Sequence, residues 1–153
     1  MIAAGSRAPA FKLRHTQYHD VMLDDFAGKR LVVVFYVADW HPVCTGQLLR
    51  YCDVLRELQR LGANLLAISA DTIWSHAAFA SAYQLPFPLL SDDCPRGSTA
   101  HAYGLMAGRG LCVIDTNGRI AWSATFPDAI DPGEDGVLSA LEALNRPKEE
   151  IPT

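Results

Sequence analysis

The chain has 153 residues, the usual size of one domain that can bury a full core without metal ions or many disulfides. Of these residues, 50% are apolar and 20% are charged, and the net charge of -4 provides no basic surface for nucleic acid or anionic lipid. We therefore expect one domain over residues 1–146, a polar and proline-broken tail over 147–153, and neither a nucleic-acid partner nor a membrane.

The chain carries no recognisable targeting signal. Its first residues, MIAAGSRAPAF, lack the basic and apolar segments of a secretory signal, and no apolar run is as long as a membrane span. We therefore expect a cytoplasmic protein. The four cysteines show neither C-x-x-C nor paired zinc-ligand spacing, so in a reducing compartment each is expected to be a free thiol.

In chain order, the first predicted elements are an N-terminal hairpin within residues 10–26 and two buried strands. LVVVFYV (31–37) and NLLAISA (64–70) are apolar on both faces, which is typical of parallel strands covered on both sides. Between them, apolar residues recur at three- and four-residue spacing up to Gly62, which predicts a helix with a glycine stop. These elements make one βαβ unit.

The next predicted elements are a helix over 73–83 and a short extended segment, LPFPLL (85–90), in which two prolines limit strand formation. A hairpin follows, formed by GLCVID and RIAWSAT. The Asn117-Gly118 pair between these two segments favours a type I′ turn, because both residues tolerate positive φ angles.

The last predicted helix starts at Asp131, which caps it, while Pro132 fills the first helical position and Glu134 reaches back to the cap. A parallel βαβ half followed by a ββα half is the element order of the thioredoxin fold. The predicted fold class is therefore α/β, a central mixed β-sheet flanked by helices, with the N-terminal β-hairpin as an extension.

Cys44 ends the stretch FYVADWHPVC, at the start of the first predicted helix. Pro42 suits the first turn, so Cys44 lies where unpaired N–H groups and the positive end of the helix dipole stabilise an anion. The thiolate is the nucleophilic form of cysteine, which makes Cys44 the best reactive candidate. A lone cysteine is more often a small buried hydrophobe, and only its surroundings argue otherwise here.

Those surroundings resemble the peroxiredoxin family over nearly the whole chain, from Gly5 to Leu144. GSRAPAFKL and VMLDDFAGKRLVVVFY are similar to the family's N-terminal segment and first core strands, and RGLCVID to the strand that begins with the active-site arginine. PLLSDDCPRGSTAHAYG is similar to the one-cysteine, alkyl hydroperoxide reductase E-like branch and to its bacterioferritin-comigratory relatives.

The resemblance implies a thiol-dependent peroxidase that reduces hydrogen peroxide or organic hydroperoxides through a cysteine sulfenic acid. Cys44 matches the peroxidatic cysteine, and Arg109 matches the arginine that holds thiolate and peroxide. A fixed guanidinium is chemically suited to that task. The implied partners are the peroxide, a thiol reductant (thioredoxin-like, glutaredoxin-like or a low-molecular-weight thiol) and, in a homodimer, a second copy. No prosthetic cofactor is implied.

Two positions depart from the family motif, which has proline seven residues, and threonine or serine three residues, before the cysteine. Here they are Val37 and His41. A hydroxyl at position 41 would cap the helix and bind the peroxide, whereas imidazole is expected to cap poorly. A protonated His41 could still stabilise the Cys44 thiolate, so His41 is a third catalytic candidate, and Val37, Trp40 and Pro42 are candidate pocket residues.

Three interpretations of these departures stay open. The protein is a weakened peroxidase, a retuned one, or a catalytically weak peroxiredoxin-like domain that senses or binds. A dithiol oxidoreductase of thioredoxin type ranks lower, because C-x-x-C is absent.

The remaining cysteines have different predicted roles. Cys52 falls on the apolar stripe of the first helix, and Cys112 lies inside an apolar strand, so both are expected to pack in the core. Cys94 lies in an acidic, proline-containing loop near the family's second resolving position without matching it, and it is a candidate resolving thiol.

The other polar residues near these motifs give weak signals. His41 and Cys44 have the spacing of a ligand pair, but no nearby segment completes a tetrahedral set, so no metal site is expected. Asp39 and Gln47 flank the nucleophile and either orient neighbours or face solvent. The remaining histidines are expected at the surface without partners: His15, His19, His76 and His101.

Overall fold

The structure, a computed structural model, describes residues 1–146, and the predicted tail over 147–153 lies outside the described residues. The strands are β1 (Lys12–Thr16), β2 (His19–Met22), β3 (Arg30–Phe35), β4 (Ala63–Ser69), β5 (Leu89–Ser91), β6 (Arg109–Ile114) and β7 (Ile120–Phe126). The helices are the 3₁₀ helix η1 (Leu23–Phe26), α1 (Pro42–Arg60), α2 (Ile73–Tyr83), α3 (Ser98–Ala102) and α4 (Asp135–Asn145).

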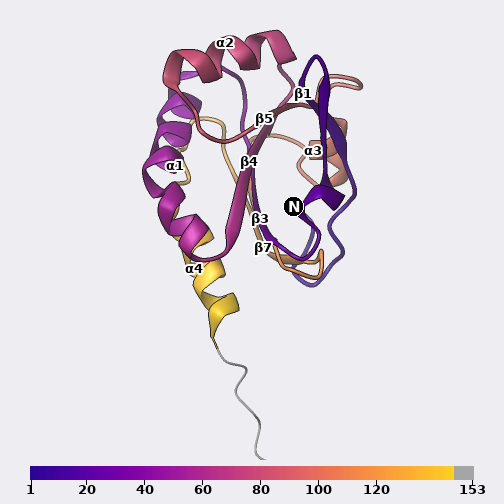
Figure 1. The fold of residues 1–153 in the computed structure, drawn as a ribbon, viewed down its shortest axis with the longest axis vertical. Coiled ribbons are helices and arrows are strands. Elements are labelled where there is room, and N and C mark those ends of the chain that lie inside the picture. The colour runs from indigo at the N-terminus through magenta and orange to yellow at the C-terminus, as the bar shows by residue number, and fades with distance from the viewer. Residues whose placement is uncertain (147–153) are drawn as a thin grey trace, which may run out of the picture.

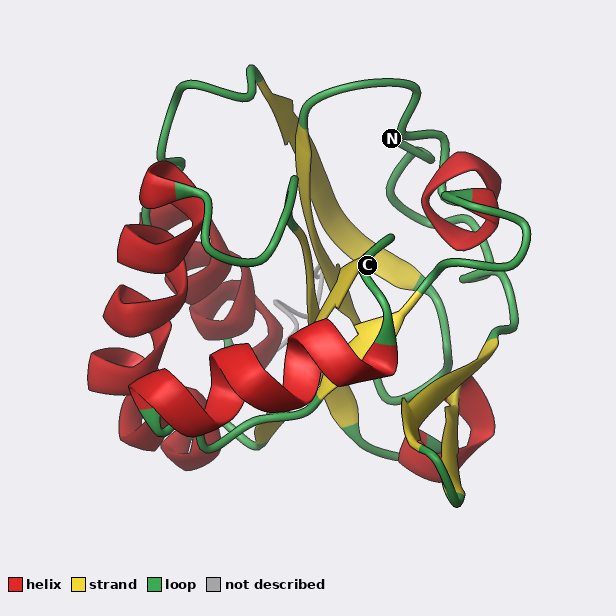
Figure 2. Cartoon of the chain, turned by 90° about the horizontal axis from the view of Figure 1, so that it is seen from above, coloured by secondary structure: helices red, strands yellow, loops and turns green. Residues whose placement is uncertain are grey.

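All seven strands form one mixed sheet, in the order β2-β1-β5-β4-β3-β6-β7. The three strands β3, β4 and β5 run parallel, whereas β6 and β7 on one side and β1 and β2 on the other pair antiparallel. Helices α1, α2 and α4 lie on one side of this sheet and α3 on the other (Figures 1 and 2). Within residues 1–146, no helix has the length and apolar character needed to cross a bilayer.

The central strand β3 explains this two-sided arrangement. Its alternate residues Val32 and Val34 join the core under α1, α2 and α4, and Leu31, Val33 and Phe35 join the core on the other face. Each of these side chains is buried. Because both faces of β3 are covered, the strand reads as a continuous apolar run rather than an alternating pattern. The thioredoxin-like α/β fold predicted from this run is confirmed.

The βαβ unit also agrees with the prediction. Strands β3 and β4 pair in parallel along their length, and α1 lies between them in sequence and ends at Arg60. Gly62 follows with φ 75°, a conformation that suits the residue after a helix end. Helix α2 spans the predicted residues. The N-terminal hairpin is present as β1 and β2, and it joins the sheet edge through the Arg14–Ser91 pair.

The predicted type I′ turn at Asn117-Gly118 is wrong, although the hairpin itself is correct. Of the two residues, only Gly118 has a positive φ, 77°. The Asp115 carboxylate accepts hydrogen bonds from the N–H groups of Asn117 and Arg119, at 2.8 and 3.0 Å, and the Gly118 N–H donates to the Asp115 carbonyl. The Asp115 side chain thus stabilises a connection that is longer than a two-residue turn, and in it only Gly118 takes the left-handed conformation.

The predicted start of the last helix is also wrong. Helix α4 begins at Asp135, because Gly133 takes φ 66° and interrupts the helical course after Pro132. Asp131 accepts from the Gly133 N–H at 2.9 Å and so stabilises a turn instead of a helix cap. The Glu134 carboxylate binds Arg50 of α1 at 2.6 Å and does not reach back to a cap.

Candidate active site

Cys44 lies in the first turn of α1 with 0% of its surface exposed. His41 is the N-cap residue of this helix, and its Nδ1 accepts a hydrogen bond from the Val43 N–H at 3.2 Å. The Thr45 hydroxyl donates to the His41 carbonyl at 2.9 Å and closes the same turn. The expectation that imidazole would cap poorly is therefore wrong, because the ring reaches the donor that a shorter hydroxyl would take.

This cap restricts the charge state of His41. An acceptor nitrogen holds a lone pair, so the ring that accepts from Val43 carries no proton on Nδ1. Protonating Nδ1 would remove the cap. A neutral His41 caps the helix of Cys44, and a charged His41 would have to give up that contact to stabilise the thiolate.

Arg109 begins β6, and its side chain is completely buried. Its Nε donates to the Asp128 carbonyl at 2.9 Å, and its Nη1 donates to Gln47 Oε1 at 3.0 Å. Gln47 is itself buried and lies three residues after Cys44, which places the two on one face of α1. Arg109 thus reaches the first turns of α1 through Gln47, and of the two roles considered for Gln47, the structure has the one that orients a neighbour.

Two buried donors at this junction have no hydrogen-bond partner within residues 1–146: Arg109 Nη2 and Gln47 Nε2. Arg109 also takes part in none of the salt bridges found in the same part of the chain. A buried guanidinium without a counter-charge is unfavourable, and buried donors are almost always satisfied in folded proteins. The arrangement is suited to an acceptor that arrives from outside, such as an anion or an oxygen atom.

A cavity of about 740 Å³ adjoins this junction. Its lining includes Val37 and Asp128. Val37 also packs against the core cluster that contains Cys44, and the Asp128 carbonyl is the group that holds Arg109 Nε. The cavity is therefore connected to both predicted catalytic residues through their immediate neighbours, while Cys44 and Arg109 themselves lie behind its wall.

Of the three predicted pocket residues, only Val37 lines this cavity. Trp40 is 50% exposed and packs against Phe79 and Tyr83, with ring centroids 5.1 and 6.0 Å away. Pro42 is exposed at the first position of α1. Both residues belong to the turn before the nucleophile and not to the wall of the cavity.

A comparison with known families agrees with this geometry. The model of the AhpC/TSA family matches residues 4–123, a span that includes Cys44 and Arg109. The chloroplastic peroxiredoxin Q of Sedum lineare is 38% identical over 150 residues, which cover 94% of this chain and 80% of that protein. The chain belongs to the AhpC/TSA family.

Solved structures place this peroxiredoxin in the same branch. BcpB from Mycobacterium tuberculosis matches with a TM-score of 0.84 at 25% identity, over 95% of this chain and 100% of that one. The Xanthomonas campestris bacterioferritin comigratory protein matches with a TM-score of 0.82 at 25% identity, over 93% and 99%. The chain spans only 57% of another relative, the peroxiredoxin Q of Gentiana triflora. The predicted fold, branch and thiol-dependent peroxidase function are confirmed.

The other three cysteines of this peroxiredoxin have the environments that the sequence predicted. All four cysteines are free. Cys112 is buried, and burial raises its pKa to about 12, so it is a thiol at neutral pH. Cys52 is half-buried, and burial followed by the nearby Asp53 charge raises its pKa. Cys94 is exposed in the loop before α3, where an incoming thiol can reach it.

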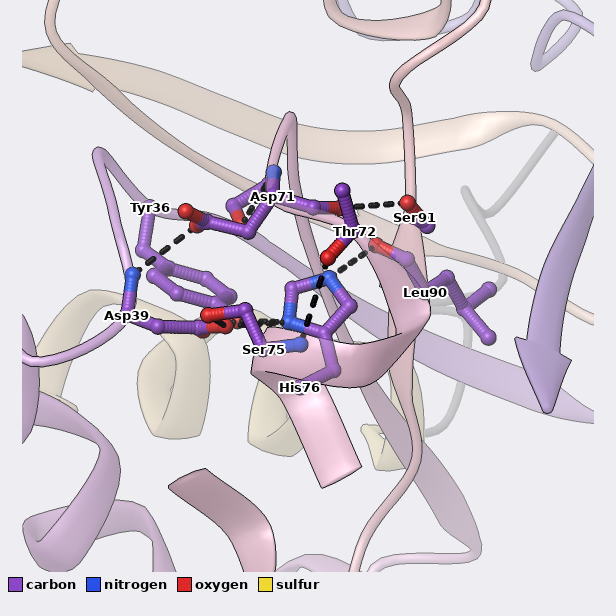
Figure 3. A network of polar contacts seen from close by, with 9 residues as sticks. Tyr36, Asp39, Asp71, Thr72, Ser75, His76, Leu90 and Ser91 are labelled. Atoms are coloured by element: carbon purple, nitrogen blue, oxygen red, sulfur yellow. Dashed lines mark hydrogen bonds and ion pairs between the residues drawn. The ribbon is translucent and has the colours of Figure 1, made fainter. Parts of the chain in front are cut away.

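One group of functional interest was missed by the sequence analysis. His76 is only 2% exposed and contacts Asp39, which is also buried (Figure 3). The prediction of a surface histidine without partners is wrong. A signal was available: Ile73, His76 and Phe79 recur at three-residue spacing and are the buried residues of α2. Of the two roles considered for Asp39, orienting neighbours fits the structure and facing solvent does not.

Proposed function

We propose that Cys44 is the peroxidatic cysteine and that Arg109 and Gln47 bind the peroxide and the charge that develops on it. The observation that carries the proposal is the pair of unsatisfied buried donors, Arg109 Nη2 and Gln47 Nε2. Gln47 lies one helical turn after Cys44, and Arg109 is hydrogen-bonded to Gln47. Donors fixed in a water-poor site stabilise developing negative charge without having to reorganise.

The reaction balances with the Cys44 thiolate, the peroxide and one proton from solvent. The Cys44 thiolate attacks the outer oxygen of the peroxide, an S–O bond forms, and the O–O bond breaks. The sulfur loses two electrons and becomes a sulfenic acid that keeps the hydroxyl hydrogen, while the leaving alkoxide or hydroxide takes a proton from solvent. Arg109 and Gln47 would donate to the leaving oxygen as its charge grows.

We infer that organic hydroperoxides reach the site through the cavity beside Val37. Phe35 and Leu105 line the cavity together with Val37, and such a surface favours an alkyl or aryl group over water alone. The solved Xanthomonas campestris relative is described in terms of its alkyl peroxide reduction activity. Hydrogen peroxide, which has no apolar group, would gain nothing from these three side chains and would contact only the polar part of the lining, which includes Asp92, Arg96 and Ser98.

The return of Cys44 to the thiol requires a reductant, and we propose that the first turn of α1 opens to admit it. Cys44 has no exposed surface, so a local movement must admit the peroxide as well, and neither Cys94 nor a thiol of another molecule can attack the sulfur without it. Cys94 as resolving thiol, a homodimer and a cytoplasmic location stay predictions. The absence of a metal and of a prosthetic group from the reaction is likewise an expectation.

Trapping the sulfenic acid tests this assignment. After one equivalent of peroxide, dimedone should label Cys44 in the wild-type protein, and the Cys44→Ser variant should carry no label at the other cysteines. Labelling of Cys94 in both proteins would contradict the assignment, and a dominant Cys44–Cys94 disulfide would make Cys94 the resolving thiol. No labelling would favour the binding or sensing alternative.

A further inference from the structure

A buried polar network lies between the end of β3, the turn before α1 and the start of α2 (Figure 3). Asp39 is at its centre. Its carboxylate accepts from the Tyr36 hydroxyl at 2.6 Å and the Ser75 hydroxyl at 2.8 Å, and it contacts His76 Nδ1 at 2.8 Å. The Asp39 N–H donates to Asp71 Oδ2 at 2.9 Å. The side chains in this group come from the end of β3, the turn before α1, and the segment that runs from the end of β4 into α2.

The contacts of His76 determine where its protons are. Its Nε2 lies 3.1 Å from the Leu90 carbonyl oxygen, which can only accept, so Nε2 carries a proton. Its Nδ1 faces the Asp39 carboxylate, and it also lies 3.2 Å from the Tyr36 oxygen, whose own hydrogen is directed to Asp39. Because the Asp39 oxygens accept from the Tyr36 and Ser75 hydroxyls and the carboxylate has no proton to donate, the contact with Asp39 needs a proton on Nδ1. The ring is therefore an imidazolium paired with a carboxylate, and both are buried.

The charged and titratable groups around this pair are compatible with that state. Burial, and next the Asp39 charge, raise the pKa of Tyr36, so its hydroxyl stays a donor. The Asp71 carboxylate adds negative charge and is already bound to the Asp39 N–H and the Ser69 hydroxyl. On β1, burial and then the charges of His19 and His76 lower the pKa of His15, which favours its neutral form.

Three residues of this network, Asp39, Asp71 and His76, have ligand atoms within 4.8 Å of one another and were considered as a metal site. Each of these atoms already has a hydrogen-bond partner. The proton on His76 Nδ1 occupies the position that a cation would take between the ring and the carboxylate. The geometry therefore describes an ion pair with a structural task.

The structural role of this ion pair concerns the turn at Trp40, which follows Asp39 in the chain. Trp40, the next residue after Asp39, has φ 67°, a left-handed conformation that bulky side chains rarely adopt. Such a conformation persists only where the surroundings fix it. Here the network fixes Asp39 through its backbone and side chain, and after Trp40 the chain reaches His41, the cap of the helix that carries Cys44.

We propose that Asp39 and His76 are positioning residues for the nucleophile. The hydrogen bond between them fixes the turn that sets where α1 begins, and through it the place of Cys44 relative to Arg109 and Gln47. The inference rests on the proposed function for its kinetic consequence, but the protonation of His76 and the order of the turn are properties of the reduced protein by itself.

Two variants separate hydrogen bonding from charge. Glutamine at position 76 cannot donate in opposite directions to Leu90 and Asp39, because both of its N–H groups are on one nitrogen, so His76→Gln breaks the link. Asp39→Asn is nearly isosteric, and its amide can donate to a neutral His76 whose Nε2 still donates to Leu90. The matched control is Ile120→Ala, which truncates the core on the opposite face of the sheet.

The expected kinetic result is specific to peroxide. In folded His76→Gln protein, the rate constant of Cys44 oxidation by hydrogen peroxide should fall roughly tenfold to a hundredfold, because the reacting groups are displaced. Alkylation of Cys44 by iodoacetamide should rise, because the first turn of α1, in which Cys44 is buried, becomes less ordered. Asp39→Asn should keep most of the wild-type peroxide rate, and Ile120→Ala should change neither rate at temperatures where it is folded.

The spectroscopic result is independent of catalysis. In protein labelled with ¹⁵N-histidine at pH 7.5, both ring nitrogens of His76 should carry protons, and one should lose its proton in Asp39→Asn. Wild-type peroxide and alkylation rates in folded His76→Gln, or an unprotonated nitrogen at His76 in the wild type, would overturn the proposal. If wild-type Cys44 does not react with peroxide, the proposed function fails, and the alkylation rates and the histidine spectrum still decide the positioning role.

Discussion

His41 replaces the threonine or serine of the family motif and keeps one of the two contacts that a hydroxyl would make at this position. The ring nitrogen accepts from the Val43 N–H and so caps α1 as a hydroxyl would. It cannot also supply the second contact of a hydroxyl, donation from the same atom to a peroxide or thiolate. The departure at position 41 therefore preserves the helix start, and in the mechanism that we propose the peroxide is bound by Arg109 and Gln47 instead.

Restoring the family's residues should raise peroxide reactivity. In the paired change Val37→Pro with His41→Thr, the cap is kept and a hydroxyl donor is gained, which is worth up to about a hundredfold in rate for an oxyanion donor. Stopped-flow oxidation of Cys44 measures this rate. His41→Ala is the control, because it loses the cap without gaining a donor and should cost about 1 kcal/mol of stability. An equal or lower rate in a folded double variant would indicate that these residues serve a different ligand.

Removing the donors should have the opposite effect. Gln47→Leu is close in size but cannot donate to a peroxide or accept from Arg109, and Arg109→Lys replaces a planar set of donors by a point charge. We expect each to lower the rate constant of Cys44 oxidation by about a hundredfold, the usual cost of one lost donor of this kind. Arg119→Lys, in the hairpin turn after the same strand, is the control and should leave the rate unchanged. Wild-type rates in both site variants would remove Arg109 and Gln47 from the mechanism.

At the level of elements, the helices that were predicted well are those whose ends are determined locally. Helix α2 ends at Gln84, which takes a left-handed φ of 52° and donates its N–H to the last carbonyls of the helix. Helix α4 was misplaced because the sequence Asp131-Pro132 is a good start signal that Gly133 overrides. Whether the helix starts at Asp131 or after Gly133 also depends on the hydrogen bond between Glu134 and Arg50, which are 84 residues apart in the sequence.

The left-handed end of α2 allows a test of stability. Glycine has no Cβ to strain this conformation, so Gln84→Gly should raise the free energy of unfolding by about 0.5–1 kcal/mol in urea denaturation. The matched control is Arg56→Gly, at an exposed position inside α1, where glycine should lower the free energy of unfolding by up to about 1 kcal/mol. A loss of stability in both variants would show that Gln84 makes a contact that outweighs the backbone strain.

The contact between α1 and the start of α4 should make stability depend on acid pH. The hydrogen bond from Arg50 lowers the pKa of Glu134 below its ordinary 4.5. A carboxylate whose pKa is lower in the folded state adds stability that is present above the unfolded pKa and is lost as pH falls through the folded value. The stability difference between wild type and Glu134→Gln should therefore shrink as pH falls below about 4.5. Glu142→Gln, exposed on the same helix, should show no such change, and a constant difference for Glu134→Gln would contradict the linkage.

At the scale of the whole molecule, the sequence was sufficient to predict the fold and the place of Cys44 at a helix start, because both depend on local patterns. The apolar run of β3 indicates a strand covered on both faces, and the position of Cys44 after Pro42 indicates a helix start. The contacts that the buried polar side chains near α1 make could not be predicted in this way. Gln47 is hydrogen-bonded to Arg109, which lies 62 residues later in the sequence. His76 contacts Asp39, which lies 37 residues earlier. The function of a buried polar residue can therefore be inferred only when the fold shows which distant residue it contacts.

The most direct test of the account is the rate at which Cys44 is oxidised by peroxide in a single turnover. The reduced protein is mixed with hydrogen peroxide or with cumene hydroperoxide in a stopped-flow instrument, and oxidation is followed through tryptophan fluorescence, with Cys44→Ser and Cys94→Ser as controls. We expect a rapid phase with both peroxides, and a faster one with the organic peroxide because of the cavity beside Val37. This phase should be kept in Cys94→Ser and lost in Cys44→Ser. Oxidation of the wild type no faster than that of a free thiol, or a rapid phase that survives in Cys44→Ser, would contradict the account.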